Sequence, residues 1–305
     1  MHPTPAALRH AQDKVAMRTR LDALGIPCPR WTVARSVDEV AAFGREVRWP
    51  LIAKTPRGGY DGKGVRRIDG PEELAAGVLD DWLSAVGEPG PLADGVLVEE
   101  AVPFTRELAA LVARNPSGEV AAWPVVETVQ ENGICPEVLA PAPDLDRAAH
   151  QAATAIATGV ATELEVTGVL AVELFEVGGS GSDGPSFLVN ELAMRPHNSG
   201  HWTIDGAVTS QFEQHLRAVL DLPLGVTDSR TAWTVMANVL GGDEDLYPAM
   251  RRVLADDATA KVHLYGKQVR PGRKIGHVTV CGDDLEDLRA RARRAADTLR
   301  GGDDR

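Results

Sequence analysis

The chain has 305 residues and a formal net charge of −12, with 25% charged and 44% hydrophobic residues. This is the balance of an ordinary globular protein, and the length suits about two or three packed subdomains. The acidic charge argues against non-specific binding to nucleic acid, and no apolar run is long enough to span a membrane. The first ten residues show no secretory signal, and three scattered cysteines (Cys28, Cys135 and Cys281) indicate a reducing compartment. We therefore expect a cytoplasmic protein that acts on small molecules.

The first third of the chain is predicted to mix helices and strands. Its predicted helices are Ala6–Leu24, one that begins after the candidate cap Ser36, and Pro71–Val86. Gly25 is the expected end of the first helix. Its predicted strands are Trp31–Val33, Leu51–Lys54, Gly64–Ile68 and Gly95–Glu100. The second and third of these strands are expected to form a hairpin around a long glycine-rich loop.

The rest of the chain continues this mixed pattern. Its predicted strands are Arg106–Val112, Val120–Val126, Val169–Val177, Phe187–Glu191, Val262–Tyr265 and His277–Val280. Its predicted helices are Asp144–Leu164, Ser210–Leu220 and Asp283–Leu299. Residues 178–184 are expected to form a polar loop within a predicted antiparallel hairpin. Because helices and strands do not alternate regularly, we expect an α+β fold rather than repeated βαβ units.

The first chemical signal is a lysine at a strand end followed by glycines. Lys54 precedes the run Gly58-Gly59-Tyr60-Asp61-Gly62-Lys63-Gly64. Glycines let backbone N–H groups approach a polyphosphate, and Lys54 and Lys63 supply positive charge. The run is not a Walker loop, because no Gly-Lys-Ser/Thr follows. An ordinary glycine-rich hairpin explains the same residues without a ligand.

The second signal is a pair of carboxylates on the two strands of the predicted hairpin. Glu173 and Glu191, the latter beside Asn190, are expected to lie on one face. Mg²⁺ prefers oxygen ligands and keeps phosphate oxygens in its shell, so the pair suits a magnesium–nucleotide site. The alternative is that each glutamate is simply an exposed strand residue, although its neighbours are apolar.

The third signal is Arg195-Pro196-His197-Asn198-Ser199-Gly200-His201-Trp202, directly after the second glutamate. Several hydrogen-bonding side chains in one short segment indicate a loop that binds an anionic intermediate or a second substrate. A capped turn would explain Pro196 and Gly200, but not Arg195 with two histidines. His197 and His201 could suggest zinc, but no third ligand is suitably spaced.

The fourth signal is the basic run Lys267-Gln268-Val269-Arg270-Pro271-Gly272-Arg273-Lys274 in an acidic protein. Charge runs are usually solvated faces. Because this run reverses the local charge and contains a Pro-Gly turn, we interpret it as an anion-binding loop.

These motifs closely resemble those of the 5-(carboxyamino)imidazole ribonucleotide synthetases, ATP-grasp ligases of purine biosynthesis. The resemblance runs from Gln12-Asp13-Lys14 to His277, nearly the whole chain. It rests on the glycine loop, on Asn190-Glu191-Leu192-Ala193 with the Arg195 segment, and on Arg270-Pro271-Gly272-Arg273-Lys274-Ile275-Gly276-His277. Three motifs in the family's order are more specific than any one of them.

The resemblance implies an ATP-grasp fold and carboxylation of an amine by ATP and bicarbonate through carboxyphosphate. It implies catalytic roles for Asp61, Arg195, His197, Asn198, Lys267, Arg270, Arg273 and Lys274. It implies nucleotide contacts from Lys14, Lys54, Gly59, Tyr60, Asp61, Gly62, Lys63, Gly64, Glu99, Glu100, Ala101, Val102, Glu107, Gln130, Asn190 and Glu191. It also implies Mg²⁺ on Glu173 and Glu191. The glycine loop would close over the triphosphate, and the basic loop would bind the phosphate of aminoimidazole ribonucleotide or the intermediate.

The resemblance also leads us to expect three divisions of the chain. They are residues 1–100 with a helical segment and a lid subdomain, residues 101–245 with the catalytic subdomain, and residues 246–305 with a small carboxy-terminal β subdomain. Family members begin with a Rossmann-like domain, and this chain starts near the point where that domain ends. We therefore expect a homodimer, or a separate chain that supplies the missing domain. Gln130 stands where a histidine is common.

Three functions fit these features. The first is the purine enzyme, and the second is a stand-alone ATP-grasp ligase for a different amine in a specialised pathway. The third is a non-catalytic nucleotide-binding module. The intact set of Glu173, Glu191, Arg195 and Lys274 argues against the third, because a binding module needs neither metal carboxylates nor an anion loop.

Overall fold

The computed structural model describes residues 1–59, 64–131, 134–178, 186–242 and 246–301. The chain separates into two compact units. The first consists chiefly of residues 3–105 and 172–194, and the second chiefly of residues 106–171 and 195–305. Within the described ranges, no helix is both long and apolar enough to cross a membrane.

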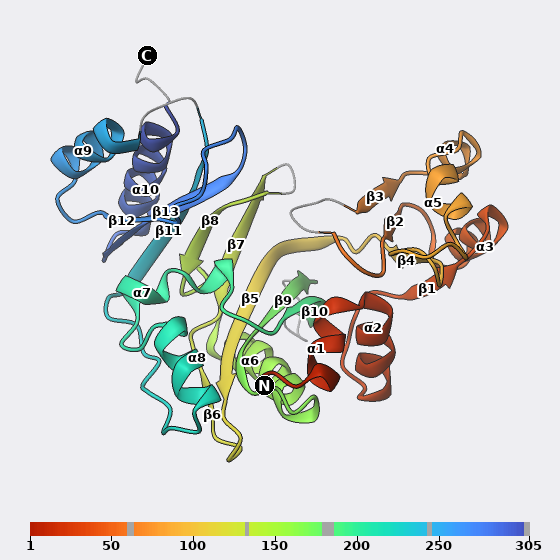
Figure 1. Ribbon diagram of the computed structural model, residues 1–305, viewed down its shortest axis with the longest axis horizontal. Coiled ribbons are helices and arrows are strands. Elements are labelled where there is room, and N and C mark those ends of the chain that lie inside the picture. Colours follow the sequence, from red (N-terminus) through yellow and green to blue (C-terminus); the bar gives the residue numbers. More distant parts are fainter. Residues whose placement is uncertain (60–63, 132–133, 179–185, 243–245, 302–305) are drawn as a thin grey trace. The chain divides into compact units, whose positions relative to one another are not determined.

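The first unit contains a four-stranded antiparallel sheet in the order β1-β4-β2-β3. These strands are β1 (Trp31–Ala34), β2 (Leu51–Lys54), β3 (Val65–Ile68) and β4 (Val96–Glu100). Three helices pack against it, α3 (Val37–Val47), α4 (Pro71–Ala75) and α5 (Asp80–Ser84) (Figure 1). The core between them includes Val40, Leu74 and Leu79. The predicted hairpin is confirmed, because Leu51 pairs with Ile68 and Lys54 with Val65.

Two helices predicted in the first unit are each interrupted. The prediction of one helix over Ala6–Leu24 is wrong, because the chain forms α1 (Pro5–Gln12) and α2 (Lys14–Ala23). Asp13 between them is extended, with φ −130°, and its Oδ1 caps α2 by accepting the Ala16 N–H at 3.0 Å. Gly77, with φ +87°, likewise separates α4 from α5 within the predicted helix Pro71–Val86.

The second unit is built on strands that run in the order β5-β7-β8-β11-β13-β12, with β6 paired to β5. They are β5 (Phe104–Arg114), β6 (Val120–Ala122), β7 (Val126–Glu131), β8 (Ile134–Ala140), β11 (Trp233–Leu240), β12 (Lys261–Leu264) and β13 (Lys274–Gly282). The predicted strand Val120–Val126 is in fact two strands, because the regular pairing with β5 stops after Ala122 and resumes at Val126. β9 (Gly168–Val177) and β10 (Ser186–Ala193) are neighbours, as expected.

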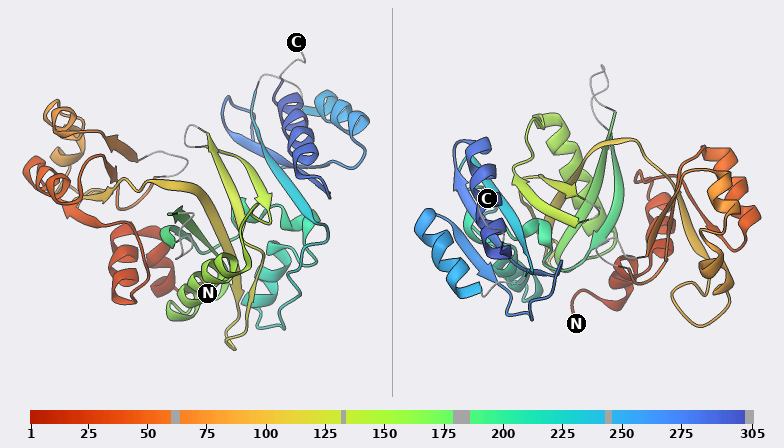
Figure 2. Two further views of the ribbon diagram at one scale, coloured as in Figure 1. Left: turned by 180° about the vertical axis from the view of Figure 1, so that it is seen from behind. Right: turned by 90° about the horizontal axis from the view of Figure 1, so that it is seen from above.

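The helices of this unit are α6 (Arg147–Glu163), α7 (Thr203–Gly206), α8 (Gln211–Val219), α9 (Leu246–Asp256) and α10 (Leu285–Arg300), with the 3₁₀ turn η1 (Asn198–Gly200). The pair β11 and β13 has two unlike faces. Val235 and Ala237 pair with Val280 and Val278 on the apolar face, which packs on α9 and α10 (Figures 1 and 2). The alternate residues face the other way and are more polar: Met236 pairs there with Thr279, and Asn238 with His277.

Helix α8 buries polar side chains and exposes apolar ones. Gln211 and Gln214 are fully buried, whereas Phe212 and Leu216 are 43% and 60% exposed, and Leu220, which caps the end of the helix, is 65% exposed. This is the reverse of the usual surface helix. The buried glutamines must therefore be hydrogen-bonded, and both are.

Candidate active site

In the first unit, the amino end of α2 lies beside the start of the glycine loop. The Lys14 N–H donates to the Pro56 carbonyl at 2.9 Å, and Asp13 forms a β-bridge with Arg57. The glycines that bound the loop adopt left-handed conformations, with φ +82° at Gly59 and +79° at Gly64. Tyr60, Asp61, Gly62 and Lys63 lie outside the described residues.

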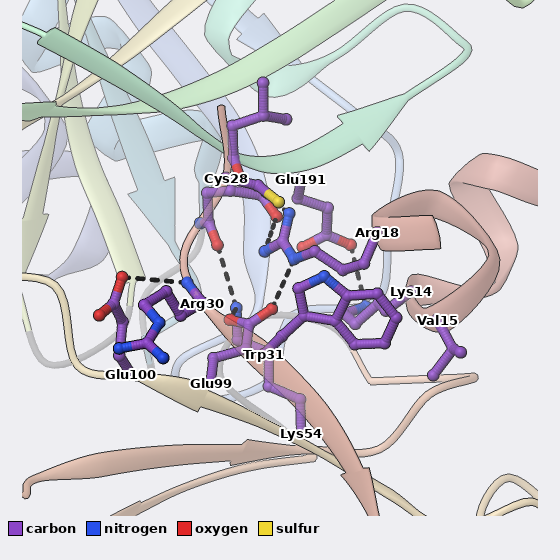
Figure 3. Close-up of polar contacts among 12 residues, drawn as sticks. Lys14, Val15, Arg18, Cys28, Arg30, Trp31, Lys54, Glu99, Glu100 and Glu191 are labelled. Atoms are coloured by element: carbon purple, nitrogen blue, oxygen red, sulfur yellow. Dashed lines mark hydrogen bonds and ion pairs between the residues drawn. The ribbon is translucent and has the colours of Figure 1, made fainter. Parts of the chain in front are cut away.

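A buried charge cluster joins α2, β2 and β4 (Figure 3). Glu99 on β4 accepts from Arg18 Nε at 2.7 Å through Oε1, and its Oε2 lies 2.7 Å from Lys54 Nζ. The side chains of Arg18 and Glu99 are 0% and 2% exposed. Burial alone would raise the pKa of Glu99, but the charges of Lys54 and Arg18 outweigh it and hold that pKa below its ordinary value. Glu99 is therefore a buried carboxylate anion.

The same cluster fixes the end of β10. Arg18 also donates to the carbonyls of Val189 and Asn190, at 2.8 and 2.9 Å. Lys54 Nζ donates to Asn190 Oδ1 at 3.0 Å, and Lys14 Nζ to Glu191 Oε1 at 3.1 Å. The alternation of buried and exposed residues in β10 breaks here, because Asn190 and Glu191 are both partly exposed. Two ammonium groups therefore meet two adjacent polar residues of one strand.

The other predicted residues of the first unit lie on the neighbouring strands. Glu173 is a partly exposed residue of β9, the strand beside β10. Residues 99–102 form the end of β4 and the turn after it. There the Glu100 Oε1 accepts the Arg30 N–H at 3.0 Å, and the Ala101 N–H donates to the Pro50 carbonyl at 3.2 Å. The Val102 carbonyl accepts the Phe104 N–H at 3.0 Å.

In the second unit, the segment after Met194 turns tightly around a buried glutamine. Arg195 is exposed, and its guanidinium donates to the Pro196 carbonyl at 3.0 Å. His197 caps the turn η1, which begins at Asn198. The amide of Gln211 exchanges two hydrogen bonds with the peptide groups of His197 and a third, at 3.0 Å, with His201 Nδ1.

Four rings of this unit form a column. His201 stacks between Phe212 and His277, with ring centroids 5.8 and 5.0 Å away, and His263 stacks on the far side of His277 at 4.6 Å. His263 Nε2 lies 2.8 Å from Asp205 Oδ2. Burial lowers the pKa of His201 to about 4 and that of His277 to about 2, so both rings are neutral at pH 7.

Tyr265 links this column to the basic loop. Its hydroxyl lies 2.8 Å from His277 Nδ1, and the Lys267 ammonium lies 4.9 Å from the centre of its ring. Lys267 Nζ also donates to the Lys274 carbonyl at 3.3 Å. Arg270 and Arg273 are exposed and both donate to Gln268. The basic residues are thus held in one loop between β12 and β13.

Two predicted residues of the second unit take no part in these contacts. Glu107 is a partly exposed residue of β5, and Gln130 is an exposed residue near the end of β7. A groove of about 690 Å³ beside α6, lined in part by Trp123, His150 and Thr154, contains none of the predicted site residues.

Sequence reasoning missed Arg18, Gln211 and Tyr265. Arg18 follows Lys14 by four residues, a spacing that places both on one face of α2 and was available as a signal. Gln211 gave no signal, since a glutamine in the first turn of a helix is normally solvated. Tyr265 lay in a predicted strand next to the basic run, but nothing in the sequence indicated its contacts.

Comparison with known proteins identifies the domains of this chain. The family model of the ATP-grasp domain matches residues 19–212, and that of the phosphoribosylaminoimidazole carboxylase C-terminal domain matches residues 234–291. Lys54 and Glu99 of the buried cluster therefore lie in an ATP-grasp domain. Enzymes of this class are ligases that use ATP.

Individual relatives narrow the class. N5-carboxyaminoimidazole ribonucleotide synthase of Mycobacterium bovis is 53% identical over 98% of this chain and 68% of that protein. The Thermus thermophilus synthetase superposes with a TM-score of 0.83 at 38% identity, over 98% of this chain and 75% of that one. The Aspergillus clavatus synthase in complex with ADP and 5-aminoimidazole ribonucleotide gives a TM-score of 0.82 at 31% identity, over 98% and 76%. The chain belongs to the N5-carboxyaminoimidazole ribonucleotide synthase family of ATP-grasp ligases.

Proposed function

We propose that this chain uses ATP and bicarbonate to carboxylate the exocyclic amine of 5-aminoimidazole ribonucleotide. The observation that carries the proposal is the meeting of Lys14 and Lys54 with Glu191 and Asn190 at the end of β10. Two ammonium groups held beside a carboxylate and an amide suit a polyphosphate and its counter-ion. The Aspergillus clavatus relative, whose structure holds ADP and this ribonucleotide, supports the choice of substrates.

The reaction has two steps. A bicarbonate oxygen attacks the γ-phosphorus of ATP, the bond to the bridging oxygen of ADP breaks, and carboxyphosphate forms. The amine nitrogen then attacks the carboxyl carbon, inorganic phosphate leaves, and the nitrogen loses a proton. Positioning and charge neutralisation supply most of the catalysis in such transfers.

The first unit would bind the nucleotide. Lys14 and Lys54 would contact its phosphates, and residues 59–64 would cover them. Residues 99–102 would hold the adenine. Because the carboxylate of Glu99 is occupied by Arg18 and Lys54, backbone groups of this turn are better placed than that side chain to contact the base. Glu107 would contact the ribose, with Gln130 nearby.

A magnesium ion is part of the proposal. Among the described residues, no group of three or more histidine, cysteine, aspartate or glutamate side chains is arranged to hold a metal. Mg²⁺ usually takes only one or two carboxylates and completes its shell with water and phosphate oxygens, so Glu173 and Glu191 fit it. When bound, the ion would neutralise charge on the phosphates.

The second unit would bind the anions of the second step. Arg195, His197 and Asn198 would stabilise carboxyphosphate. The basic loop would bind the phosphate of the ribonucleotide through Lys267, Arg270, Arg273 and Lys274. Tyr60 and Asp61 would face the imidazole.

Measurement of ADP release by the purified chain tests the proposal. We expect release that needs bicarbonate and rises when 5-aminoimidazole ribonucleotide is added, with carbon-13 from labelled bicarbonate appearing in the product. A panel of other amines is the control. If another amine stimulates ADP release and the ribonucleotide does not, that amine is the acceptor and the proposed substrate is wrong. ATP binding without turnover would favour a non-catalytic module.

The location, the domain divisions and the assembly of the chain are also proposals. We infer that the chain acts in the cytoplasm, that its divisions follow residues 1–100, 101–245 and 246–305, and that it forms a homodimer or joins a separate chain. Fractionation, limited proteolysis and light scattering test them in turn.

A further inference from the structure

The side-chain amide of Gln211 makes three hydrogen bonds to the Arg195–His201 segment. Its side chain is fully buried at the start of α8. Its Oε1 accepts the His197 N–H at 2.9 Å, and its Nε2 donates to the His197 carbonyl at 2.8 Å. Its own N–H donates to Thr203 Oγ1 at 2.9 Å, and that hydroxyl donates to the Gly200 carbonyl at 2.6 Å. Gln211 therefore holds His197 directly and Gly200 through Thr203.

The two backbone bonds fix which way the amide points. An N–H group can bond only to the amide oxygen, and a carbonyl only to the amide nitrogen. A flipped Gln211 would set oxygen against the His197 carbonyl, so its orientation follows from chemistry. The second hydrogen of Nε2 then points at His201 Nδ1, 3.0 Å away.

This contact determines the tautomer of His201. Nδ1 must accept, so in the neutral ring the proton is on Nε2. The ring is neutral at pH 7, because burial, aided by the nearby cations Arg195, Lys267 and Lys274, lowers its pKa to about 4. Stacking between Phe212 and His277 holds the plane of the ring.

His197 lies beside the same amide. Its Nδ1 accepts the Ser199 N–H at 3.4 Å in capping η1 and lies 2.9 Å from the Ser199 hydroxyl. The tautomer fixed by Gln211 is that of His201, whose Nε2 offers an N–H donor. A lone pair in that place would repel an anion, whereas an N–H stabilises one.

We propose that Gln211 is a positioning residue for the reaction: it holds the His197 peptide and fixes His201 as the Nε2–H tautomer, so that His201 offers a donor to the anionic carboxylated intermediate. This inference rests on the proposed function for the identity of the anion. The tautomer itself does not depend on it.

Gln214 provides a matched control on the same helix. It is also fully buried, and its amide makes the same two-bond pair with another residue, Gly225: Oε1 accepts the Gly225 N–H at 2.7 Å, and Nε2 donates to the Gly225 carbonyl at 2.8 Å. Substitutions at Gln211 and Gln214 should cost similar stability, but only those at Gln211 should affect the histidines.

The test compares Gln211→Glu and Gln214→Glu with the wild-type chain. Nitrogen-15 spectra of histidine-labelled protein, assigned with a His201→Asn variant, should show Nε2 protonated and Nδ1 unprotonated in His201. Gln211→Glu replaces the donor by a carboxylate oxygen, which should draw a proton to Nδ1. Gln214→Glu should leave the signals of His201 unchanged. A protonated Nδ1 in the neutral wild-type ring would overturn the proposal.

Kinetics provide the second readout. Gln211→Glu should lower kcat about 100-fold and leave KM for ATP unchanged. The His201 donor acts on the carboxylated anion and not on bound ATP, so its loss affects turnover alone. Gln211→Met, which removes the amide without adding charge, should show the same split if the glutamate variant does not fold. An equal loss of kcat in Gln214→Glu would mean that the effect is structural and would overturn the proposal. Wild-type protein inactive with the ribonucleotide would overturn the proposed function, while the spectra still decide the tautomer.

Discussion

Arg18 and Glu99 form an ion pair that is closed to solvent, with Arg18 Nε 2.7 Å from Glu99 Oε1 and both side chains almost wholly buried. Lys54 is the second counter-charge of Glu99. Removal of the carboxylate would leave two buried cations facing each other. This pair therefore governs both the stability of the first unit and the placement of Lys54 beside β10.

We expect Glu99→Gln to destabilise the protein by about 3–5 kcal/mol, because it leaves buried charge uncompensated. Urea unfolding at pH 7 measures this loss. The control is Asp69→Asn, which breaks the exposed Arg67–Asp69 pair and should cost at most about 1 kcal/mol. Equal costs in the two variants would contradict the role given to Glu99.

The stabilisation from Glu99 should depend on pH in one direction. Its pKa is lowered in the folded chain, so its contribution is complete above the ordinary pKa of a glutamate and is lost as the pH falls through the folded value. The stability difference between wild type and Glu99→Gln should therefore shrink in acid. Unfolding curves from pH 7 down to about pH 3 measure it, and a difference that grows with acid would show the reverse sign.

Glu191→Gln tests the metal assignment. We expect ADP release to fall by about 100-fold or more, because a charge-neutralising ligand of the phosphates is lost. Excess magnesium should recover part of the rate. Glu88→Gln, at an exposed glutamate of the first unit, is the control and should retain full turnover. Full activity in Glu191→Gln would remove Glu191 from the site.

Gly200 and Gly159 should respond oppositely to alanine. A Cβ on Gly200 would lie 2.3 Å from both Gln211 Oε1 and Leu111 Cδ2, so Gly200→Ala should cost about 1–3 kcal/mol and impair turnover. Gly159 lies inside α6 with nothing within 4 Å of the added methyl group, so Gly159→Ala should stabilise by up to about 1 kcal/mol. Thermal unfolding ranks the two variants against wild type.

The sequence was informative where a local pattern determines structure. The hairpins β2–β3 and β12–β13 were predicted because apolar runs flank a glycine-rich or basic loop. Strands β8 and β11 were not predicted. Pro136 interrupts the pattern of β8, and the nearly continuous burial of β11 removes the alternation that marks a strand. Asp13 broke a helix through its contact with Arg57, which is distant in sequence.

The candidate site also contains residues that the sequence predicted and residues that it did not. Lys14, Lys54, Asn190 and Glu191 were predicted for the nucleotide and do meet in the structure, although their roles remain proposals. Arg18 could not be predicted by composition, since an arginine in a helix is usually exposed. Glu99, 81 positions away, and two carbonyls of β10 bury it, and these contacts exist only once the chain has folded.

The reversed polarity of α8 has a consequence for protein engineering. Methods that fill every buried position with leucine and every exposed one with lysine would replace Gln211 and Gln214 first and keep neither of their backbone pairs. The resulting helix would have the usual pattern of apolar buried and polar exposed residues. It would nevertheless lose the hydrogen bonds that hold the segment from Arg195 to His201. A stabilised variant of this enzyme should keep the native residues of α8.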